Sequence, residues 1–451
     1  MYNPREENLT EGPLFRQIVR FSLPLVLSNM LQVFFNMSDI AVVGRFAGAR
    51  ALGAVGSTAI LVTLFTGFLI GMGSGINVIV ARYLGARADR DVREAIHTSF
   101  LLMTITGLCL LMIGFGFSGP LLRLLGTKDE LISGAIVYLK IYSAGMPGAA
   151  LFNFGSAVLA ASGDTRRPLV FLSCAGVLNV LLNLFFVIVC RMAEAGVALA
   201  SAISQSAAAL LILVSLTHRT GSCCLSLRHL RITPVKARQI LSLSIPSGMQ
   251  NAIFAIANLF VQAGVNTFDA VMVEGNSAAA NADGLVYDIM AAIYTACSSF
   301  MSQNYGAGKR KRVIHSYYIS LSLSLGAGLL MGGMLVLFGR QFLSIFTSEK
   351  EVVEAGMFRL RVMGLSYGFS AFMDCTISAS RGLGKSAVPT VIVILGSCVF
   401  RVIWVYTVFA YFHTITSLYL LYIFSWTLTA VAEILYFARC WKEKRRRMPE
   451  E

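Results

Sequence analysis

Residues Phe21 to Gly44 read FSLPLVLSNMLQVFFNMSDIAVVG, and this stretch decides what kind of fold the chain can adopt. It is long and apolar enough to cross a bilayer as one helix. Pro24 predicts a kink near its start, because proline lacks a backbone N–H. A polar face on a membrane helix is costly unless it lines protein or water, so we expect a functional helix rather than an anchor. Four polar residues step by three, four and three positions and therefore share one helix face: Asn29, Gln32, Asn36 and Asp39.

The same pattern returns in the second half of the chain, where residues 243–260 read LSIPSGMQNAIFAIANLF. Asp39 has no counterpart there, because Val261 occupies the equivalent position. Further matches continue at a shift of 221, so that the register holds over about 145 residues and indicates an internal duplication. The aligned pairs are Pro24 with Pro246, Asn29 with Asn251, Asn36 with Asn258, Gly85 with Gly306, Glu130 with Glu351 and Pro168 with Pro389.

The composition excludes a soluble globular domain. Of the 451 residues, 56% are hydrophobic and 13% are charged, and the mean hydropathy is +0.71. The net charge of +14 does not indicate a nucleic-acid partner, because 26 of the 37 Lys and Arg residues lie in the terminal segments and alternate loops, as the positive-inside rule predicts. The nine cysteines are scattered without a CxxC motif, so we expect reduced thiols. The N-terminal residues lack the pattern of a removable signal peptide.

Apolar runs long enough to cross a membrane recur about twelve times, which is typical of a polytopic α-helical membrane protein. An even number of spans places both termini on one side, and the Lys and Arg distribution places that side in the cytoplasm of a cell-membrane protein. The predicted spans are 18–44, 52–79, 95–118, 134–159, 168–191, 196–217, 239–265, 278–301, 314–338, 356–380, 388–411 and 416–438.

The two halves are expected to form two bundles of six helices. Residues 1–225 make the N-terminal bundle and residues 226–451 the C-terminal bundle, joined by the long segment 218–238. Each half starts on the same side of the membrane, so the halves should be related by a pseudo-two-fold axis along the membrane normal. The expected fold class is therefore all-α and polytopic, with 12 transmembrane helices.

Three local motifs, two of them with a copy in the other half, carry more information than composition. They are NMSDI at 36–40 followed by Val43-Gly44, SQNYGAG at 302–308 with ARYLGA at 81–86, and ASGDTRRP at 161–168 with SRGLGKS at 380–386. Each motif could be a helix end, where Gly permits the final turn and Pro begins the next helix. Together, in this order, they resemble the multidrug and toxic compound extrusion (MATE) family of cation-coupled antiporters, over roughly residues 14 to 440.

The resemblance implies a secondary transporter that exports organic, often cationic compounds while Na⁺ or H⁺ moves inward. It implies alternating access between the two bundles and no cofactor other than the coupling ion. The expected partners are small organic molecules and the lipid bilayer, and we expect a monomer. No structural metal site is predicted, and a Na⁺ ion would bind near Asp374 or Asp39.

In the first half, the acidic residue that the family carries in its first span matches Asp39, with Asn36 one turn earlier. The family's Asn-rich fifth span matches Asn179 and Asn183. Some members have Asp where Asn183 stands, so the resemblance leaves the coupling ion open. Asp39 could instead lie at the outer interface, hydrogen-bonded to Asn36.

In the second half, the acidic position of the tenth span looks like Asp374, and Asn258 is a polar residue of the seventh span. Asp283 of the eighth span is a candidate to line a cleft. Arg401 and Asp374 have similar predicted depths in the membrane, so they could form a structural ion pair, since lone buried charges are costly. Coupling at Asp374 and a structural pair both remain open.

Two other functional classes are less consistent with the sequence. A lipid-linked oligosaccharide flippase of the same superfamily is the main alternative, but it would favour a cleft rich in Arg and Lys, which the first six spans lack. An intramembrane enzyme would need reactive groups within the spans. The HExxH motif is missing from the sequence, and the five His residues fall near span ends or in loops, so we expect no enzyme.

Overall fold

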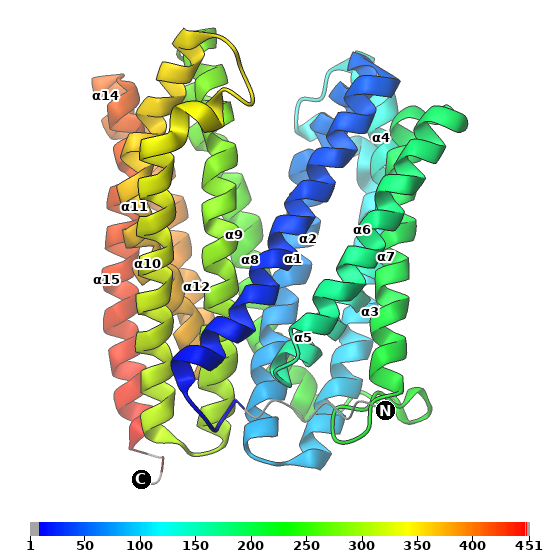
Figure 1. The fold of residues 1–451 in the computed structure, drawn as a ribbon, viewed down its shortest axis with the longest axis vertical. Helices are drawn as coiled ribbons and strands as arrows, with labels where there is room; N and C mark the ends of the chain where they lie inside the picture. The colour runs from blue at the N-terminus through cyan, green and yellow to red at the C-terminus, as the bar shows by residue number, and fades with distance from the viewer. Residues whose placement is uncertain (1–8, 447, 449–451) are drawn as a thin grey trace. The chain divides into compact units, whose positions relative to one another are not determined.

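The computed structural model describes residues 9–446 and 448, and within them every regular element is a helix. The all-α fold predicted from the hydropathy pattern is therefore confirmed. The chain divides into two compact units (Figure 1). Among the described residues, unit 1 contains Leu27–Gly248, and unit 2 contains Leu9–Val26 together with Met249–Arg446 and Met448.

Unit 1 is built from the helices of the first half of the chain and from the start of the long helix that follows the linker. Its elements are α1 (Leu14–Val42, from Leu27 onward), η1 (Val43–Ala47), α2 (Ala49–Gly85), α3 (Asp89–Leu124), α4 (Asp129–Ala144), α5 (Met146–Ala161), α6 (Arg166–Leu184), η2 (Phe185–Val189), α7 (Ala193–Thr217), η3 (Leu227–His229) and the first part of α8 (Pro234–Val265).

Unit 2 is built from the helices of the second half and from the start of α1. Its remaining elements are the rest of α8 from Met249, α9 (Ala270–Gly306), α10 (Arg310–Leu343), α11 (Lys350–Gly382), α12 (Ala387–Val393), η4 (Ile394–Val399), α13 (Phe400–Trp404), η5 (Val405–Phe409), α14 (Ala410–Phe412) and α15 (Ile415–Arg445). The segments η1, η2, η4 and η5 are π-helical turns.

Of the twelve predicted spans, eleven correspond to one long helical segment each in the described residues, and the other corresponds to the pair α4 and α5. Ten helices are long and apolar enough to cross a membrane, or eleven if α4 and α5 form one bent span. The remaining segment, α11, has 33 residues and is long enough, but it carries Arg359, Arg361 and Asp374 within its length. The twelve-span organisation thus includes one helix that is unusually rich in charge.

The predicted span 134–159 differs from the structure, because two helices occupy it. α4 and α5 meet at Gly145 with a bend of 43°. Pro147 lies in the first turn of α5, where its ring and missing N–H prevent the hydrogen bond that a continuous helix would need. The span therefore bends at a position that the sequence marks with the residues Gly-Met-Pro.

The two units exchange the starts of two helices. α1 begins in unit 2 and enters unit 1 at Leu27, whereas α8 begins in unit 1 and enters unit 2 at Met249. Both changes occur three residues after a proline inside the helix, Pro24 in α1 and Pro246 in α8. The predicted division at residue 225 lies 23 residues before this exchange point, and the division into bundles 1–225 and 226–451 stays a prediction.

The start of α8 packs against α2 in unit 1 through small residues. Ser244 donates a hydrogen bond to the carbonyl oxygen of Met72 at 2.9 Å. A Cβ atom placed on Gly75 would lie 2.6 Å from the backbone nitrogen of Ser244, so only glycine permits this approach. Gly71 and Gly75 lie one turn apart, the spacing at which small residues allow membrane helices to pack closely.

We expect Gly75→Val to destabilise unit 1, because the added side chain would push α8 away from α2. Overpacking of this kind costs about 1–3 kcal/mol, and the measurement is the thermal stability of the purified protein in detergent. Gly56→Val is the matched control, since Gly56 lies on the same helix with open space around its Cβ position. Equal stability of both variants would contradict the close packing.

In unit 2, the end of α9, the start of α10 and the loop between them hold the segment that precedes α1. Gln303 accepts a hydrogen bond from the Leu9 N–H at 2.9 Å, and Asn304 donates one to the Leu9 carbonyl at 3.2 Å. Lys309 and Arg312 donate to the carbonyls of Thr10 and Gly12, at 2.9 and 2.8 Å. The SQNYGAG motif thus has two roles. Its first residues bind the segment that precedes α1, and its glycines lie where α9 ends.

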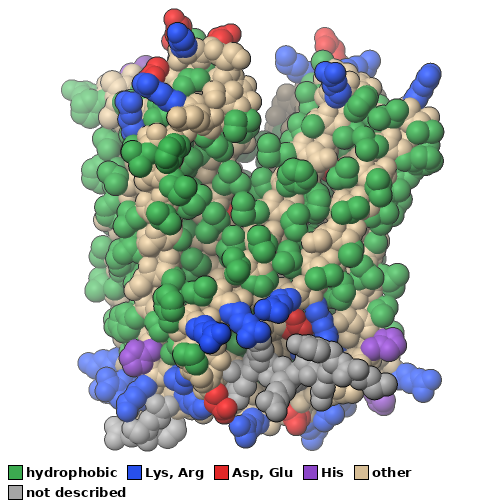
Figure 2. All heavy atoms as spheres, in the orientation of Figure 1, with side chains coloured by type: hydrophobic (Ala, Val, Ile, Leu, Met, Phe, Trp, Pro, Cys, Tyr) green, Lys and Arg blue, Asp and Glu red, His purple; other side chains and the backbone are tan. Residues whose placement is uncertain are grey.

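On the visible face of each unit, hydrophobic side chains cover the middle and Lys and Arg side chains gather near the ends (Figure 2). This pattern is typical of a membrane protein whose middle zone contacts the hydrocarbon of the bilayer and whose two ends contact water. Within unit 2, the start of α1 and the end of α15 are drawn at the same end (Figure 1). The side of the membrane on which that end lies stays a prediction.

Candidate functional site

A polar cluster in unit 1 brings together three helices around one carboxylate. Asp39 of α1 accepts hydrogen bonds from Asn183 of α6 at 2.5 Å and from Ser201 of α7 at 3.1 Å. Asn179 donates to Ser201 at 3.3 Å and accepts from Asn183 at 3.1 Å. Three residues predicted separately, Asp39, Asn179 and Asn183, therefore lie in one connected network.

Local helix geometry positions these side chains. Asn179 and Asn183 are four residues apart on α6, so they project from the same face. Asn183 is completely buried and Asn179 is 6% exposed. A π-helical turn follows two of the contributors within four residues, η1 after Asp39 and η2 after Asn183. Such turns are frequent at functional sites because they displace side chains from regular helical positions.

The cluster offers oxygen atoms to a small cation. It contains the two carboxylate oxygens of Asp39, the amide oxygens of Asn179 and Asn183, and the hydroxyl of Ser201. The amide oxygen of Asn183 is buried and has no hydrogen-bond partner among the described residues. Hard cations prefer carboxylate, carbonyl and hydroxyl oxygens, and a single carboxylate can equally take up one proton. The site could therefore hold one Na⁺ or one H⁺.

Asn36 was predicted beside Asp39 but does not join this network. Its side chain is exposed, and it makes no hydrogen bond in the part of the chain that the structure describes. The hydrogen bond between Asn36 and Asp39 that an interfacial Asp39 would use is thus not formed in the structure. A role for Asn36 stays a prediction.

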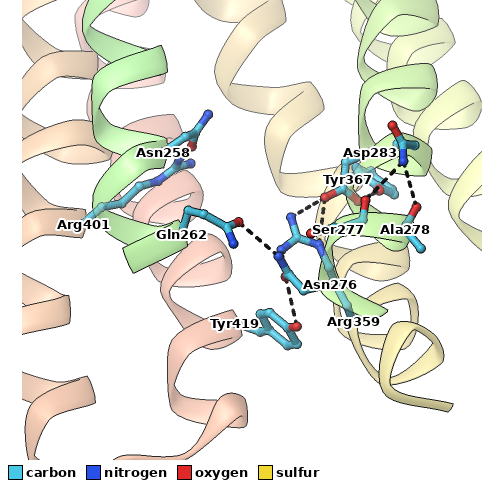
Figure 3. Close-up of polar contacts among 11 residues, drawn as sticks. Asn258, Gln262, Asn276, Ser277, Ala278, Asp283, Arg359, Tyr367, Arg401 and Tyr419 are labelled. Carbon is cyan, nitrogen blue, oxygen red and sulfur yellow. Dashed lines mark hydrogen bonds and ion pairs between the residues drawn. The ribbon is translucent and has the colours of Figure 1, made fainter. Parts of the chain in front are cut away.

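A second network in unit 2 is organised around a buried ion pair (Figure 3). Arg359 of α11 contacts the Asp283 carboxylate of α9 through two nitrogens, at 2.5 and 3.1 Å, and Tyr367 donates to the other carboxylate oxygen at 2.5 Å. Arg359 also donates to Asn276 at 2.6 Å, and Asn276 accepts from Tyr419 at 3.1 Å. Asp283, predicted as a cleft residue, is therefore fully bonded within the helix bundle.

Arg401 lies in a cage of aromatic rings. Its side chain is 1% exposed and its guanidinium lies over the rings of Tyr422, Phe254 and Trp426, at 4.7, 5.3 and 5.9 Å from their centroids. Its Nη1 donates to Asn258 at 2.9 Å, so these two predicted residues lie together (Figure 3). Aromatic faces and the amide oxygen stabilise the buried positive charge in place of a carboxylate.

Asp374 does not form an ion pair with Arg401 among the described residues. Asp374 is 6% exposed and accepts a hydrogen bond from Ser370 at 2.9 Å. It interacts with the charges of Arg381 and Arg401 over a longer range. The structural-pair interpretation, in which Arg401 and Asp374 bond directly, therefore has no contact to support it, whereas the coupling role of Asp374 stays a prediction.

Sequence reasoning missed three residues that complete these sites. Ser201 closes the Asp39 cluster, Arg359 neutralises Asp283, and Arg381 interacts with Asp374. Arg359 lies inside the predicted span 356–380, and a charge within a span is a signal that an opposite charge must lie nearby. The pairing with α9 could not be obtained from hydropathy, since it depends on how α9 and α11 face each other.

Buried carboxylates and guanidinium groups inside helices of spanning length are typical of membrane transporters. The MatE family model matches residues 24–185 and again residues 246–407. The two matches are 222 residues apart, which is also the distance between Pro24 and Pro246 in the sequence. This chain belongs to the MatE family, as the resemblance implied. It is therefore a multi-pass membrane transporter and not an enzyme.

Relatives and solved structures agree with this assignment. The chain is 30% identical to the probable multidrug resistance protein YpnP of Bacillus subtilis, over 80% of this chain and 81% of that protein. It is 24% identical to a FAD transporter of Shewanella oneidensis, over 80% of each chain. The outward-facing structure of a multidrug resistance MATE transporter of the MOP superfamily has the same fold, with a TM-score of 0.91, 21% identity and coverage of 99% and 100%.

Proposed function

We propose that this protein exports organic compounds across the cell membrane in exchange for inward movement of H⁺ or Na⁺, with both termini in the cytoplasm. The observation that carries the proposal is the Asp39 cluster of unit 1. A half-buried carboxylate with hydrogen-bond donors from two other helices can release and bind a single positive charge. Binding there would change the contacts between α1, α6 and α7, which is what coupling requires.

The coupling stoichiometry of this site follows from its charge. Asp39 is the one carboxylate in the cluster, because Asn stands at 179 and 183. One bound H⁺ or one Na⁺ therefore neutralises the cluster, and a second monovalent cation would have no negative charge to bind. We propose one coupling ion per cycle at Asp39, with Asp374 as a separate carboxylate in unit 2.

The substrate class is proposed from the relatives. Several are called multidrug proteins, which suggests organic compounds of varied structure. One is called a FAD transporter, so an anionic flavin nucleotide is a second class to test. We propose that the transporter acts as a monomer.

The test is transport by purified protein in proteoliposomes. Ethidium, as a fluorescent organic cation, and FAD, as an anion, would be tested with a pH gradient alone and with a Na⁺ gradient alone. We expect accumulation of one probe driven by one of the two gradients and abolished when an ionophore collapses that gradient. Transport whose rate depends on neither gradient would contradict the proposal of ion coupling.

A further inference from the structure

Glu433 is a carboxylate without any hydrogen bond in the interior of unit 2. It lies on α15, its side chain is 0% exposed, and neither carboxylate oxygen has a hydrogen-bond partner among the described residues. A buried ionised carboxylate without donors is strongly unfavourable. Glu433 must therefore either hold a proton or obtain a compensating charge. Ion coupling at the Asp39 cluster gives Glu433 no role.

Arg381 is the cation that interacts electrostatically with Glu433. It lies in the last turn of α11 and donates through Nη2 to Gln250 of α8 at 2.7 Å. Its Nε is buried and has no hydrogen-bond partner among the described residues. The guanidinium interacts electrostatically with both Glu433 and Asp374. One donor of Arg381 is thus uncommitted while a carboxylate within reach of its charge lacks donors.

Asp374 and Arg381 are seven residues apart on α11, so they lie on the same face about 10 Å apart along the axis. The helix that carries Glu433, α15, packs along α11. Glu433 interacts with Asp374 as a like charge and with Arg381 as an opposite charge. A single guanidinium therefore serves two carboxylates that repel each other.

The other groups around Glu433 do not supply a second compensating charge. On its own helix, Tyr436 interacts with it, and Cys440 and Glu443 lie beyond Tyr436. On α8, Gln250 is neutral and accepts from Arg381. From α13, Arg401 interacts with Asp374. The groups that act on Glu433 are thus Arg381, Asp374 and Tyr436 within the described residues.

We propose that Glu433 is a further proton-carrying carboxyl of the transport cycle and that Arg381 is its positioning residue. This inference rests on the proposed ion-coupled function. When Glu433 is ionised, Arg381 turns its uncommitted donor to the Glu433 carboxylate. When a proton from water forms the O–H bond of Glu433, the guanidinium stays protonated and its charge becomes available to Asp374. Release of the proton to water breaks that O–H bond and restores the first state.

This change of partner by Arg381 links the protonation of Glu433 to the electrostatic environment of Asp374. Arg381 is bonded to α8 through Gln250, so a change of its partner alters contacts among α8, α11 and α15. A permanently protonated Glu433 would instead be a passive packing residue. The two roles differ in whether the protein gains and loses a proton at this position.

Glu433→Gln tests the proposal because glutamine has the shape of protonated glutamate and cannot ionise. Two measurements are made on the full protein: the pH profile of probe export in proteoliposomes, and infrared difference spectra of carboxyl groups after a pH jump. We expect E433Q to lose one protonated-carboxyl band and to shift or flatten the pH profile, with export reduced severalfold on the alkaline side. Glu433→Asp should keep a pH-dependent profile but displace it along the pH axis, because its carboxyl is ionisable but lies on a shorter side chain.

Glu443→Gln is the matched control on the same helix, since Glu443 is exposed, and its pH profile should equal the wild type. Identical spectra and pH profiles for E433Q and wild type would overturn the proposal. If E433Q does not fold, E433D decides: a displaced profile supports the proposal and an unchanged one overturns it. Wild-type export that ignores both ion gradients would defeat the proposed function, yet the infrared band would still report proton exchange at Glu433.

Discussion

Replacing Asp39 by Asn is expected to reduce ion-driven export strongly while the protein still folds. The substitution removes the negative charge of the unit 1 cluster but keeps an oxygen of nearly the same shape beside Asn183 and Ser201. Loss of the charge weakens cation binding, and each ~1.4 kcal/mol of lost binding energy lowers affinity tenfold. We therefore expect export to fall at least about tenfold, measured as gradient-driven probe uptake in proteoliposomes.

The control for Asp39 is an acidic residue of the same unit that lies outside the cluster. Asp129 is exposed in the first turn of α4, so Asp129→Asn should transport at the wild-type rate. The decisive comparison is export per folded molecule, with thermal stability measured in parallel. Wild-type export by a stable Asp39→Asn protein would assign the coupling ion to a different carboxylate.

The second large effect is expected at the buried ion pair of unit 2. Arg359 is 7% exposed and Asp283 is 19% exposed at the side chain. Removing either partner leaves the other charge uncompensated among Asn276, Tyr367 and Tyr419, which costs about 3–5 kcal/mol. We expect Arg359→Gln and Asp283→Asn each to lower the thermal stability strongly, and the double variant to recover most of the loss.

An exposed ion pair in the same unit provides the comparison. Arg340 and Glu354 are 2.7 Å apart, with side chains 63% and 53% exposed. Water already solvates both groups, so Arg340→Gln should change stability by about 0–1 kcal/mol. If the double variant at Asp283 and Arg359 were no more stable than the single ones, the two residues would act independently and the pair would not be the anchor of this network.

The sequence predicted the helices and several site residues for a clear physical reason. Hydrophobic runs and their repeat depend on local composition, so the spans could be located before the structure. The steps between Asn29 and Asp39 indicated a polar face of α1, and the Asn residues of α6 indicated another. That these faces meet, with Asp39 bonded to Asn183, required the rotation of each helix, which periodicity alone does not give.

Charge pairing in the second half was harder to predict for the same reason. Asp374 and Arg401 were matched by depth in the membrane, yet depth leaves the direction of each side chain open. In the structure Arg401 is enclosed by aromatic rings, and the direct ion pair is formed by Arg359 and Asp283 instead. The bend at Gly145 could have been anticipated, because Pro147 follows it within a predicted span.

The exchanged starts of α1 and α8 have a consequence for how such a chain could have arisen. Each unit is completed by a piece of helix from the other half of the sequence, as in a domain-swapped dimer whose two copies have been joined. A single half of the sequence would lack either the start of α8 that packs at Gly75 or the segment before α1 that Gln303 and Asn304 bind. Because the linker keeps both halves in one chain, each unit receives the helix start of the other half without a second copy of the protein.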